Sequence, residues 1–340
     1  MKQRHVWVGM GISLALVVYL FFFFPVHYGR LWASLASANA VHLLLAAGLL
    51  AGTLAIRSWR WQYLLKPLKE VEFSSLMSAT SIGMMANMIF PLRLGEIVRA
   101  VVLGHREHMD KSASLATVVV DRLLDGFTIL FILAVLLLMS SLPLEGGVAR
   151  AVWWGGLAML ALYLGVFVFL FYLHHSTAQA LRAVRRIDRV LPLRWVDRLS
   201  QFLESFSAGL LPLGRKEYLG QIIVTSIILW GLYGLFNFLV VLAFQLQLPL
   251  TVGFLLVVFQ AFAVMVPSSP GFVGTYHAAS VACLTLWGVT PEVALSVALV
   301  MHAIGFFLTI GIGASYLWGI GVSLHDITRP GMDISSSPPA

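Results

Sequence analysis

Long apolar runs with few charges constrain this chain more than any other feature of its sequence. A bilayer core is about 30 Å thick and a helix rises about 1.5 Å per residue, so roughly 20 apolar residues cross it. Six runs are long enough, at 6–24, 40–61, 113–139, 151–173, 219–244 and 293–320. Hydrophobic residues make up 59% of the 340 positions and charged residues 11%, far from soluble averages. The sequence therefore predicts an all-α polytopic membrane protein with six full spans.

Two further apolar stretches, 73–103 and 251–287, are each interrupted near the middle by a polar segment containing proline and glycine. The interruptions lie at 87–99 and 267–275. Irregular backbone survives at membrane depth only where it lines a cavity or is buried in protein. A hairpin that enters and leaves by the same side fits each stretch better than one continuous helix. We therefore expect two re-entrant helical hairpins.

The distribution of lysine and arginine gives an independent test, because cytoplasmic loops are enriched in both. With a cytoplasmic N-terminus and two re-entrant hairpins, only Arg30 and Arg150 of the 22 basic residues face the outside. This topology places both termini in the cytoplasm. It also repeats the order span, span, hairpin, span in opposite orientations, over halves of about 1–140 and 151–325. Inverted repeats with opposed hairpins are typical of secondary transporters, although the halves share no residue-level identity.

The segment between the fourth and fifth runs, 176–216, is basic and amphipathic. Its arginines include Arg182, Arg185, Arg186 and Arg189. Apolar residues at helical spacing opposite an arginine face indicate a cytoplasmic surface that lies on anionic lipid headgroups. The alternative is a cytoplasmic connecting segment whose arginines reflect only its location on the cytoplasmic side. Residues 1–325 form a single predicted transmembrane domain, and the Ser- and Pro-rich end, 326–340, is predicted to be a disordered tail.

Three charged side chains, Arg93, Glu96 and Arg99, follow the first break at intervals of three residues. This spacing places them along one side of a helix. Pro91 suits the tip of a hairpin or the first turn of the returning helix, and Gly95 allows a neighbour to approach closely. Charged groups at membrane depth are costly and usually mark a pathway or an internal paired site.

The run at 113–139 carries Asp121, Arg122 and Asp125. The two carboxylates are four residues apart and project from one helical face. Because an uncompensated pair there would be expensive, we expect them to face Arg93 or Arg99, which leaves Arg122 for another partner or a ligand.

Two interpretations of these charges remain open. In the first, they form a closed network of ion pairs that holds the hairpin to the neighbouring span. In the second, the arginines bind a phosphate and the carboxylates orient them, which suits several cations beside a helix break. The phosphate-binding residues would be Arg93, Arg99 and Arg122, and the orienting residues Glu96, Asp121 and Asp125.

The second break is predicted to form a gate opposite the first. Its hairpin and gate residues are Pro267, Pro270, Gly271, Gly274, Thr275 and His277, with Asn87, Pro91 and Gly95 in the first hairpin. The prolines stop one helix, the glycines permit tight backbone, and Thr275 is expected to cap the next helix. His277 is either a titrating coupling group or a hydrogen-bonded packing residue. We expect no catalytic residue, metal, cofactor or nucleic-acid partner, and Cys283 is the one cysteine.

The segment 87–99, followed by Ala116-Thr117-Val118-Val119-Val120-Asp121-Arg122-Leu123-Leu124-Asp125, resembles the signature of the lysylphosphatidylglycerol synthase transmembrane-region family of flippase-like membrane proteins. The segment 267–279 resembles its second signature. In two-domain members the membrane part is held to move an aminoacylated lipid, while a soluble domain performs the transfer. This chain lacks room for that domain after its last span, so the resemblance implies lipid translocation. Phe272 and His277 depart from the Gly and Glu of many relatives.

The expected function is therefore movement of an anionic phospholipid, such as an aminoacylated phosphatidylglycerol, or of a lipid-linked precursor between the leaflets of the inner membrane. A membrane-embedded lipid transferase, or the membrane subunit of one working with a soluble lipid-modifying enzyme, is the alternative. A non-transporting scaffold is the third possibility, and it predicts that matched apolar residues can replace the charges without loss of function.

Overall fold

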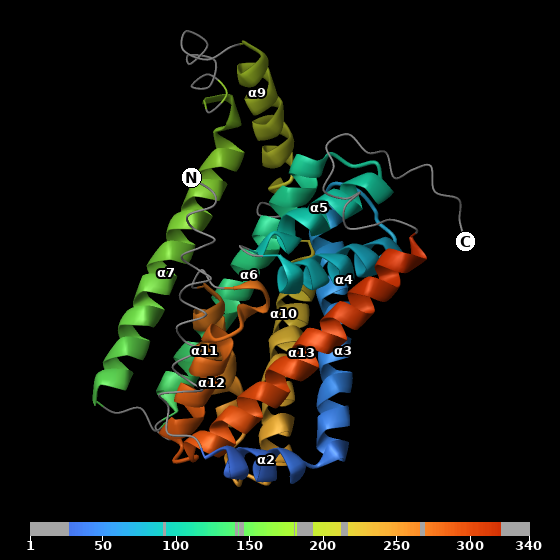
Figure 1. The fold of residues 1–340 in the computed structure, drawn as a ribbon. Helices are drawn as coiled ribbons and strands as arrows, with labels where there is room; N and C mark the ends of the chain where they lie inside the picture. Colours follow the sequence, from blue (N-terminus) through green and yellow to red (C-terminus); the bar gives the residue numbers. More distant parts are fainter. Residues whose placement is uncertain are drawn as a thin grey trace.

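The computed structural model describes residues 27–90, 93–139, 142, 146–179, 181, 193–211, 217–265 and 269–320, where every regular element is a helix (Figure 1). The α-helices are α2 Tyr28–Ala36, α3 Ala40–Leu65, α4 Phe73–Ile89, α5 Gly95–Arg106, α6 Lys111–Leu138, α7 Gly146–His175, α9 Leu193–Ala208, α10 Leu219–Ala243, α11 Thr251–Met265, α12 Thr275–Leu286 and α13 Pro291–Gly319. A short 3-10 helix, η5 Pro270–Phe272, lies between α11 and α12.

Four of these helices, α3, α7, α10 and α13, are long and apolar enough to cross a membrane. Each coincides with a predicted run. Helix α6 covers a fifth run with 28 residues, but it carries four charged side chains within that length, Lys111, Asp121, Arg122 and Asp125. The predicted first span at 6–24 and the arginines 182, 185, 186 and 189 lie outside the described residues. The helical class of the fold and its apolar, membrane-crossing character are confirmed.

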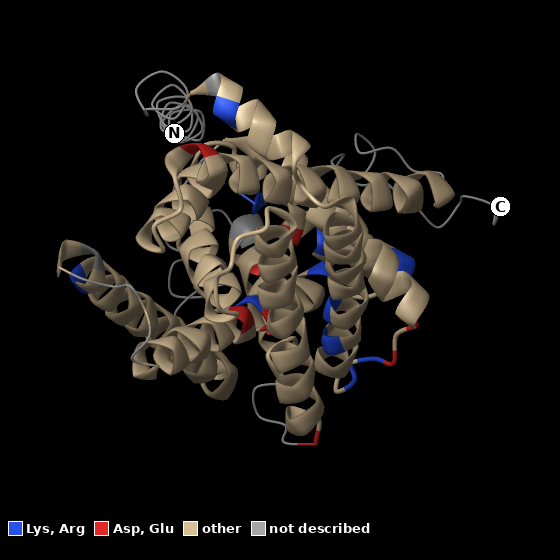
Figure 2. Cartoon of the chain, turned by 90° about the horizontal axis from the view of Figure 1, so that it is seen from below, with Lys and Arg blue, Asp and Glu red and all other residues tan. Residues whose placement is uncertain are grey.

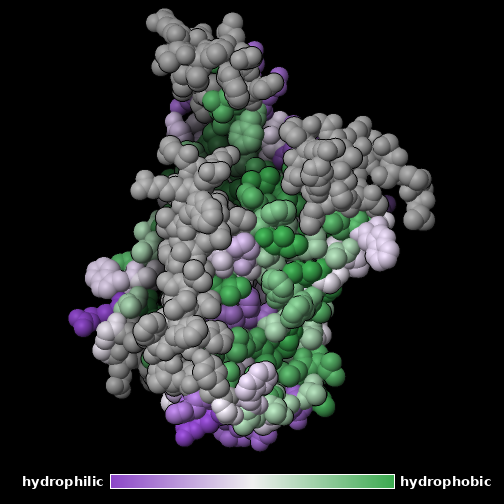
Figure 3. Space-filling view, viewed as in Figure 1, coloured by the Kyte–Doolittle hydropathy of each residue, from purple (hydrophilic) through white to green (hydrophobic). Residues whose placement is uncertain are grey.

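The outer surface of the bundle is suited to lipid. Figure 3 shows apolar residues over the flank that carries α13 and α3, and hydrophilic residues at the bottom of the view. Helix α7 packs on α6 and α9 and exposes large apolar side chains along its length. Trp153 and Trp154 are exposed toward one end of α7 and Tyr172 toward the other, in the manner of aromatic residues at the two membrane interfaces.

Helices α4 and α5 form a tight hairpin around the first break. Helix α4 ends at Ile89, and Phe90 adopts an extended conformation. The glycines Gly83 and Gly95 allow the two helices to touch, because a Cβ atom at Gly95 would overlap the Gly83 carbonyl oxygen and the Asn87 side chain. Helices α11 and α12 form the second hairpin, in which Gln260 hydrogen-bonds Ser280 across the pair at 3.2 Å.

The two hairpins enter the bundle from opposite ends (Figure 1). Helices α3 and α10 pack side by side and antiparallel, since the Asn39 N–H before α3 donates to the Ala243 carbonyl at the end of α10 (2.8 Å). The main packing contacts of the two halves correspond when α2–α6 are exchanged with α9–α13. The contact of α4 with α13 then corresponds to that of α11 with α6. The contact of α2 with α13 corresponds to that of α9 with α6. The hairpin tips meet, because a Cβ at Gly271 would lie 3.4 Å from the Met88 carbonyl oxygen.

The close contact at Gly95 generates a stability prediction. Gly95→Ala should destabilise the protein by about 1–3 kcal/mol or more, since the added methyl group must push α4 away from α5. Gly52→Ala in α3 is the matched control, because nothing lies within 4 Å of a Cβ built there. Thermal unfolding in detergent should show a lower Tm for Gly95→Ala alone, and equal Tm values would contradict the packing described.

Candidate functional site

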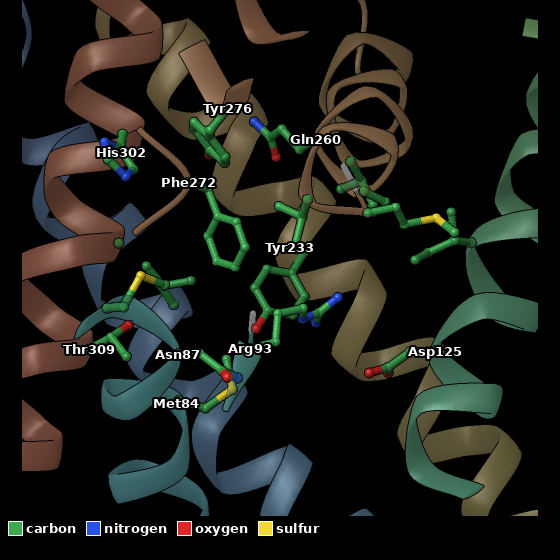
Figure 4. Close-up of a pocket in the computed structure, with 18 of the residues that line it drawn as sticks. Met84, Asn87, Arg93, Asp125, Tyr233, Gln260, Phe272, Tyr276, His302 and Thr309 are labelled. Atoms are coloured by element: carbon green, nitrogen blue, oxygen red, sulfur yellow. The ribbon is translucent and has the colours of Figure 1, made fainter. Parts of the chain in front are cut away.

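A cavity of about 240 Å³ lies where the two hairpins meet, near the middle of the bundle. It is lined by residues from α3, α4, α6, α7, α10, α11, α12 and α13 and from the segments at both hairpin tips. Arg93 and Asp125 lie on one side, while Gln260 and His302 lie on the other (Figure 4). Tyr233 stands near the centre in that view. Most of the remaining wall is apolar or aromatic, so the cavity has a charged side within a largely apolar enclosure.

Asp121 on α6 is the most deeply enclosed charge beside this cavity. Its carboxylate pairs with Arg60 on α3 at 2.7 Å and with Arg99 on α5 at 2.8 Å. Asp121 and Arg60 are both fully buried. The Arg60 Nη1 group also donates to the Ser226 hydroxyl at 3.1 Å. One carboxylate therefore ties together three helices, and its partners satisfy its oxygens in the apolar interior.

Asp125, one turn further along α6, lies at the cavity wall and collects three arginines. Arg60 is 2.7 Å away, Arg57 is 2.8 Å away and Arg122 is 2.9 Å away. The indole N–H of Trp230 donates to the same carboxylate at 3.1 Å. Figure 2 shows acidic and basic residues close together near the centre of the bundle, among helices that are otherwise uncharged. Charges so placed are stable only when each has partners in good geometry.

The remaining acid, Glu96, links the first hairpin to α6. Its carboxylate lies 3.1 Å from the Arg122 guanidinium and accepts a hydrogen bond of 3.0 Å from the Asn87 amide. The predicted orienting residues Glu96, Asp121 and Asp125 thus belong to one network, and Asn87 and Arg122 join it at the cavity.

Arg93 differs from the other arginines of the site. It lines the cavity, and within the described residues no carboxylate lies within 4 Å of its guanidinium. Its backbone has φ 55°, a left-handed conformation that costs a non-glycine residue roughly 1 kcal/mol or more. Strained backbone and charged groups at membrane depth both cost free energy, so neither feature of Arg93 stabilises the fold.

Arg99 has a different environment from the one we predicted for a phosphate ligand. It is buried, pairs with Asp121 and lies 3.8 Å from the centre of the Trp61 ring. It does not line the cavity. The expected pairing of an α6 carboxylate with the first hairpin is present in the Asp121–Arg99 contact, while Pro91 lies outside the described residues.

Arg57 and Arg60 were not predicted as site residues. Both lie near the end of an apolar run, where arginines commonly mark the cytoplasmic boundary. The signal was their spacing: residues three apart share a helical face, as do Asp121 and Asp125 four apart on α6. Two cations on one apolar helix and two anions on another are complementary.

The tip of the second hairpin is held by two histidines. The His302 ring lies 2.7 Å from the Gly271 carbonyl oxygen, and the Gly274 N–H donates to His277 Nδ1 at 3.3 Å. The two rings stand edge to face, with 4.6 Å between their centres. His277 therefore has a packing role, and its possible coupling role stays a prediction.

The backbone of this tip is left-handed at Gly271, Phe272 and Gly274, with φ of 68°, 60° and 91°. The capping prediction for Thr275 is wrong: Gly274 precedes α12, its amide is bonded by His277, and the Thr275 hydroxyl donates backwards to the Phe272 carbonyl at 3.2 Å. Pro270 begins η5, and Pro267 lies outside the described residues.

The second half has a neutral polar network on α10, α11 and α12. Asn237 on α10 donates to Gln260 on α11 at 3.1 Å, and Gln260 donates to Ser280 on α12. Gln260 also lines the cavity. The polar side chains of the two halves therefore face one cavity with different charge.

The different environments of Arg60 and Arg93 can be tested by measuring the stability of variants at each position. Arg60→Met should destabilise the protein by about 3 kcal/mol, because Asp121 and Asp125 would each lose a buried partner. Arg93→Met removes the same charge where there is no ion pair, and it should change stability by less than about 1 kcal/mol. Thermal unfolding of the two purified variants measures the difference. A loss at Arg93 equal to that at Arg60 would refute the distinction.

Comparison with known proteins identifies the family. The family model described as "Lysylphosphatidylglycerol synthase TM region" matches residues 6–313. The chain is 26% identical over 350 residues to Glycosyltransferase AglD of Haloferax volcanii, covering 94% of this chain but 55% of that protein, so it spans about half of that relative's length. A UPF0104 membrane protein of Methanothermobacter thermautotrophicus is 26% identical over 309 residues, covering 88% of this chain and 91% of that protein. No solved structure matches. The chain belongs to the lysylphosphatidylglycerol synthase transmembrane-region family of membrane proteins.

Proposed function

We propose that this protein moves an anionic lipid between the two leaflets of the inner membrane. The observation that carries the proposal is the cavity between the hairpin tips, which is charged on one side, largely apolar elsewhere, and bordered by Arg93, which forms no ion pair with the described residues. A lipid presents the same combination, with a phosphate at one end and apolar chains at the other. The cavity volume of about 240 Å³ suits a headgroup, while the acyl chains remain in the bilayer.

In this proposal six helices span the membrane, the two hairpins are re-entrant from opposite faces, and both termini are cytoplasmic. The antiparallel packing of α3 and α10 supports it, as does the entry of the hairpins from opposite ends of the bundle. The basic residues near the predicted span ends favour the same orientation. Interrupted helices that meet at mid-depth are the usual site of substrate binding in transporters with inverted repeats.

The cavity-lining arginines are proposed to bind the headgroup phosphate. Arg57, Arg93 and Arg122 line the cavity and supply guanidinium N–H donors, which bind phosphate oxygens strongly because both partners are charged. Asp125 and Glu96 fix two of these guanidinium groups in place. Arg99, which we expected to be a direct ligand, is instead proposed to position Asp121 from behind the cavity wall.

Alternating access is proposed to arise from movement of the hairpin tips. They meet at Met88 and Gly271, and His302 holds the second tip through the Gly271 carbonyl oxygen. Phe272 projects into the cavity from that tip (Figure 4). Separation of the tips would expose the headgroup site to one side at a time, and the left-handed backbone at Arg93 and Phe272 lies at the two points that would change.

Translocation can be measured in proteoliposomes as the leaflet accessibility of chain-labelled phosphatidylglycerol. The intact protein should move this lipid faster than empty liposomes, and Arg93→Gln should slow that movement about tenfold, because one charged contact to phosphate is lost. The control is Arg106→Gln, which removes the same charge from the exposed end of α5. No movement of phosphatidylglycerol or phosphatidic acid by the folded, intact protein would refute the translocation proposal.

A second candidate is the membrane subunit of a lipid transferase. One observation favours it: 94% of this chain matches about half of a protein named as a glycosyltransferase. A soluble lipid-modifying enzyme would then supply the chemistry at the membrane surface. Purification from native membranes under mild detergent tests this candidate, which requires a stoichiometric enzyme partner; purification without any partner, together with lipid movement by the protein alone, would exclude it.

A further inference from the structure

The charges around the cavity do not balance. Five arginines belong to the site: Arg57, Arg60, Arg93, Arg99 and Arg122. The acids that pair with them within the described residues are Glu96, Asp121 and Asp125. Two positive charges are therefore in excess. The residues that line the cavity give the same excess of two positive charges, because they include three arginines, Arg57, Arg93 and Arg122, and one acid, Asp125.

An excess of this size is costly in a membrane interior. A buried charge without a partner costs several kcal/mol, and structural ion-pair networks avoid that cost by pairing each member. Behind the wall, the Asp121 carboxylate has two arginine partners, Arg60 and Arg99. These three side chains together with Glu96 contribute no excess of charge there. The excess lies on the cavity side, where a ligand could balance it.

Hydrogen-bond donors also remain unused on that side. Within the described residues, the buried Arg57 Nε and Arg122 Nη2 groups donate no hydrogen bond, and both of these arginines line the cavity; Arg99, behind the wall, also has two such groups, Nε and Nη2. Arg57 is 2% exposed, so solvent does not satisfy its Nε group. Arg93 adds a guanidinium without an ion pair at the same wall. Three arginines thus line one small volume, and two of them have buried N–H groups without a hydrogen-bond partner.

The opposite side of the cavity does not alter this balance. Gln260, Tyr276 and His302 line it, together with Phe272 and apolar residues. The network that lies behind it is the neutral set of Asn237, Gln260 and Ser280. A headgroup that also carries a cation would find no carboxylate there among the described residues, apart from Asp125, which already has three arginine partners.

From the charge excess and the free donors we infer that the lipid bound in this cavity carries a terminal phosphate monoester. This inference rests on the proposed function and specifies its substrate class. A phosphate monoester carries about two negative charges near neutral pH and three terminal oxygens. It neutralises the excess and offers one oxygen to each of Arg57, Arg93 and Arg122. A phosphodiester carries one negative charge and leaves one positive charge unbalanced.

The inference distinguishes this chain from a carrier of aminoacylated phosphatidylglycerol. A lysyl ester of that lipid has one phosphodiester charge and two ammonium groups, so its headgroup is a net cation. Placing it in a cavity that already holds two excess positive charges would be repulsive at short range. The lysylated lipid should therefore bind more weakly than phosphatidylglycerol itself.

Ligand binding can be measured separately from transport by thermal unfolding of the purified full-length protein in detergent. The probes are phosphatidic acid, phosphatidylglycerol and lysyl-phosphatidylglycerol with identical acyl chains, and glycerol 3-phosphate as a soluble monoester. Phosphatidic acid should bind about tenfold more tightly than phosphatidylglycerol, the difference expected for one additional charge-assisted contact. Lysyl-phosphatidylglycerol and glycerol 3-phosphate should bind more weakly than either.

The Arg93→Gln variant sharpens this test, because it lowers the excess from two charges to one without breaking an ion pair. Its preference for phosphatidic acid over phosphatidylglycerol should fall to about twofold, and Arg93→Lys should restore it because the charge returns. Arg106→Gln should leave the preference unchanged.

Equal or tighter binding of phosphatidylglycerol or its lysyl ester by the intact protein would overturn the monoester inference. Translocation of phosphatidylglycerol could still be observed in that case, so the proposed function would survive. Stabilisation by glycerol 3-phosphate equal to that by phosphatidic acid would overturn the assignment to a lipid.

Discussion

The pairing of two carboxylates on α6 with two arginines on α3 is the interaction on which the rest of this structure depends. Asp121 and Asp125 cannot remain ionised in a membrane interior without partners, and Arg57 and Arg60 supply them at 2.7–2.8 Å. The four side chains fix the relative rotation of α3 and α6, because each helix must turn its charged face to the other. The first hairpin then docks on this pair through Arg99.

Around that fixed centre, the hairpins are built for close approach and carry strain at their tips. Glycines bring α4 and α5 into contact, while a non-glycine residue occupies left-handed backbone at each tip, Arg93 in the first and Phe272 in the second. Both side chains line the same cavity. Left-handed backbone at non-glycine residues costs free energy, and these are the two positions that the proposed movement of the hairpin tips would change.

The sequence predicts the fold here better than it predicts the site. Apolar run length and the Pro- and Gly-containing breaks locate the helices and both interruptions, since these features follow from local chemistry. The partners of Asp125 could not be assigned, because three-dimensional packing decides which of several arginines reaches a carboxylate. The arginines of α3 were missed for a related reason: a charge near the end of an apolar run has the same sequence signature whether it faces lipid headgroups or turns inward.

The two halves share an arrangement of helices but differ in their charge. The cavity is therefore charged on the side of the first half and uncharged on the side of the second hairpin. If both hairpins carried arginines, a phosphate would be held equally on both sides. The second hairpin instead presents Gln260, Tyr276 and Phe272. The proposed phosphate site therefore belongs to α3, α6 and the first hairpin, and in this proposal the second hairpin moves away from the headgroup without breaking a charged contact. Under the proposed function, related helix arrangements with different charge would let one half bind the headgroup while the other opens.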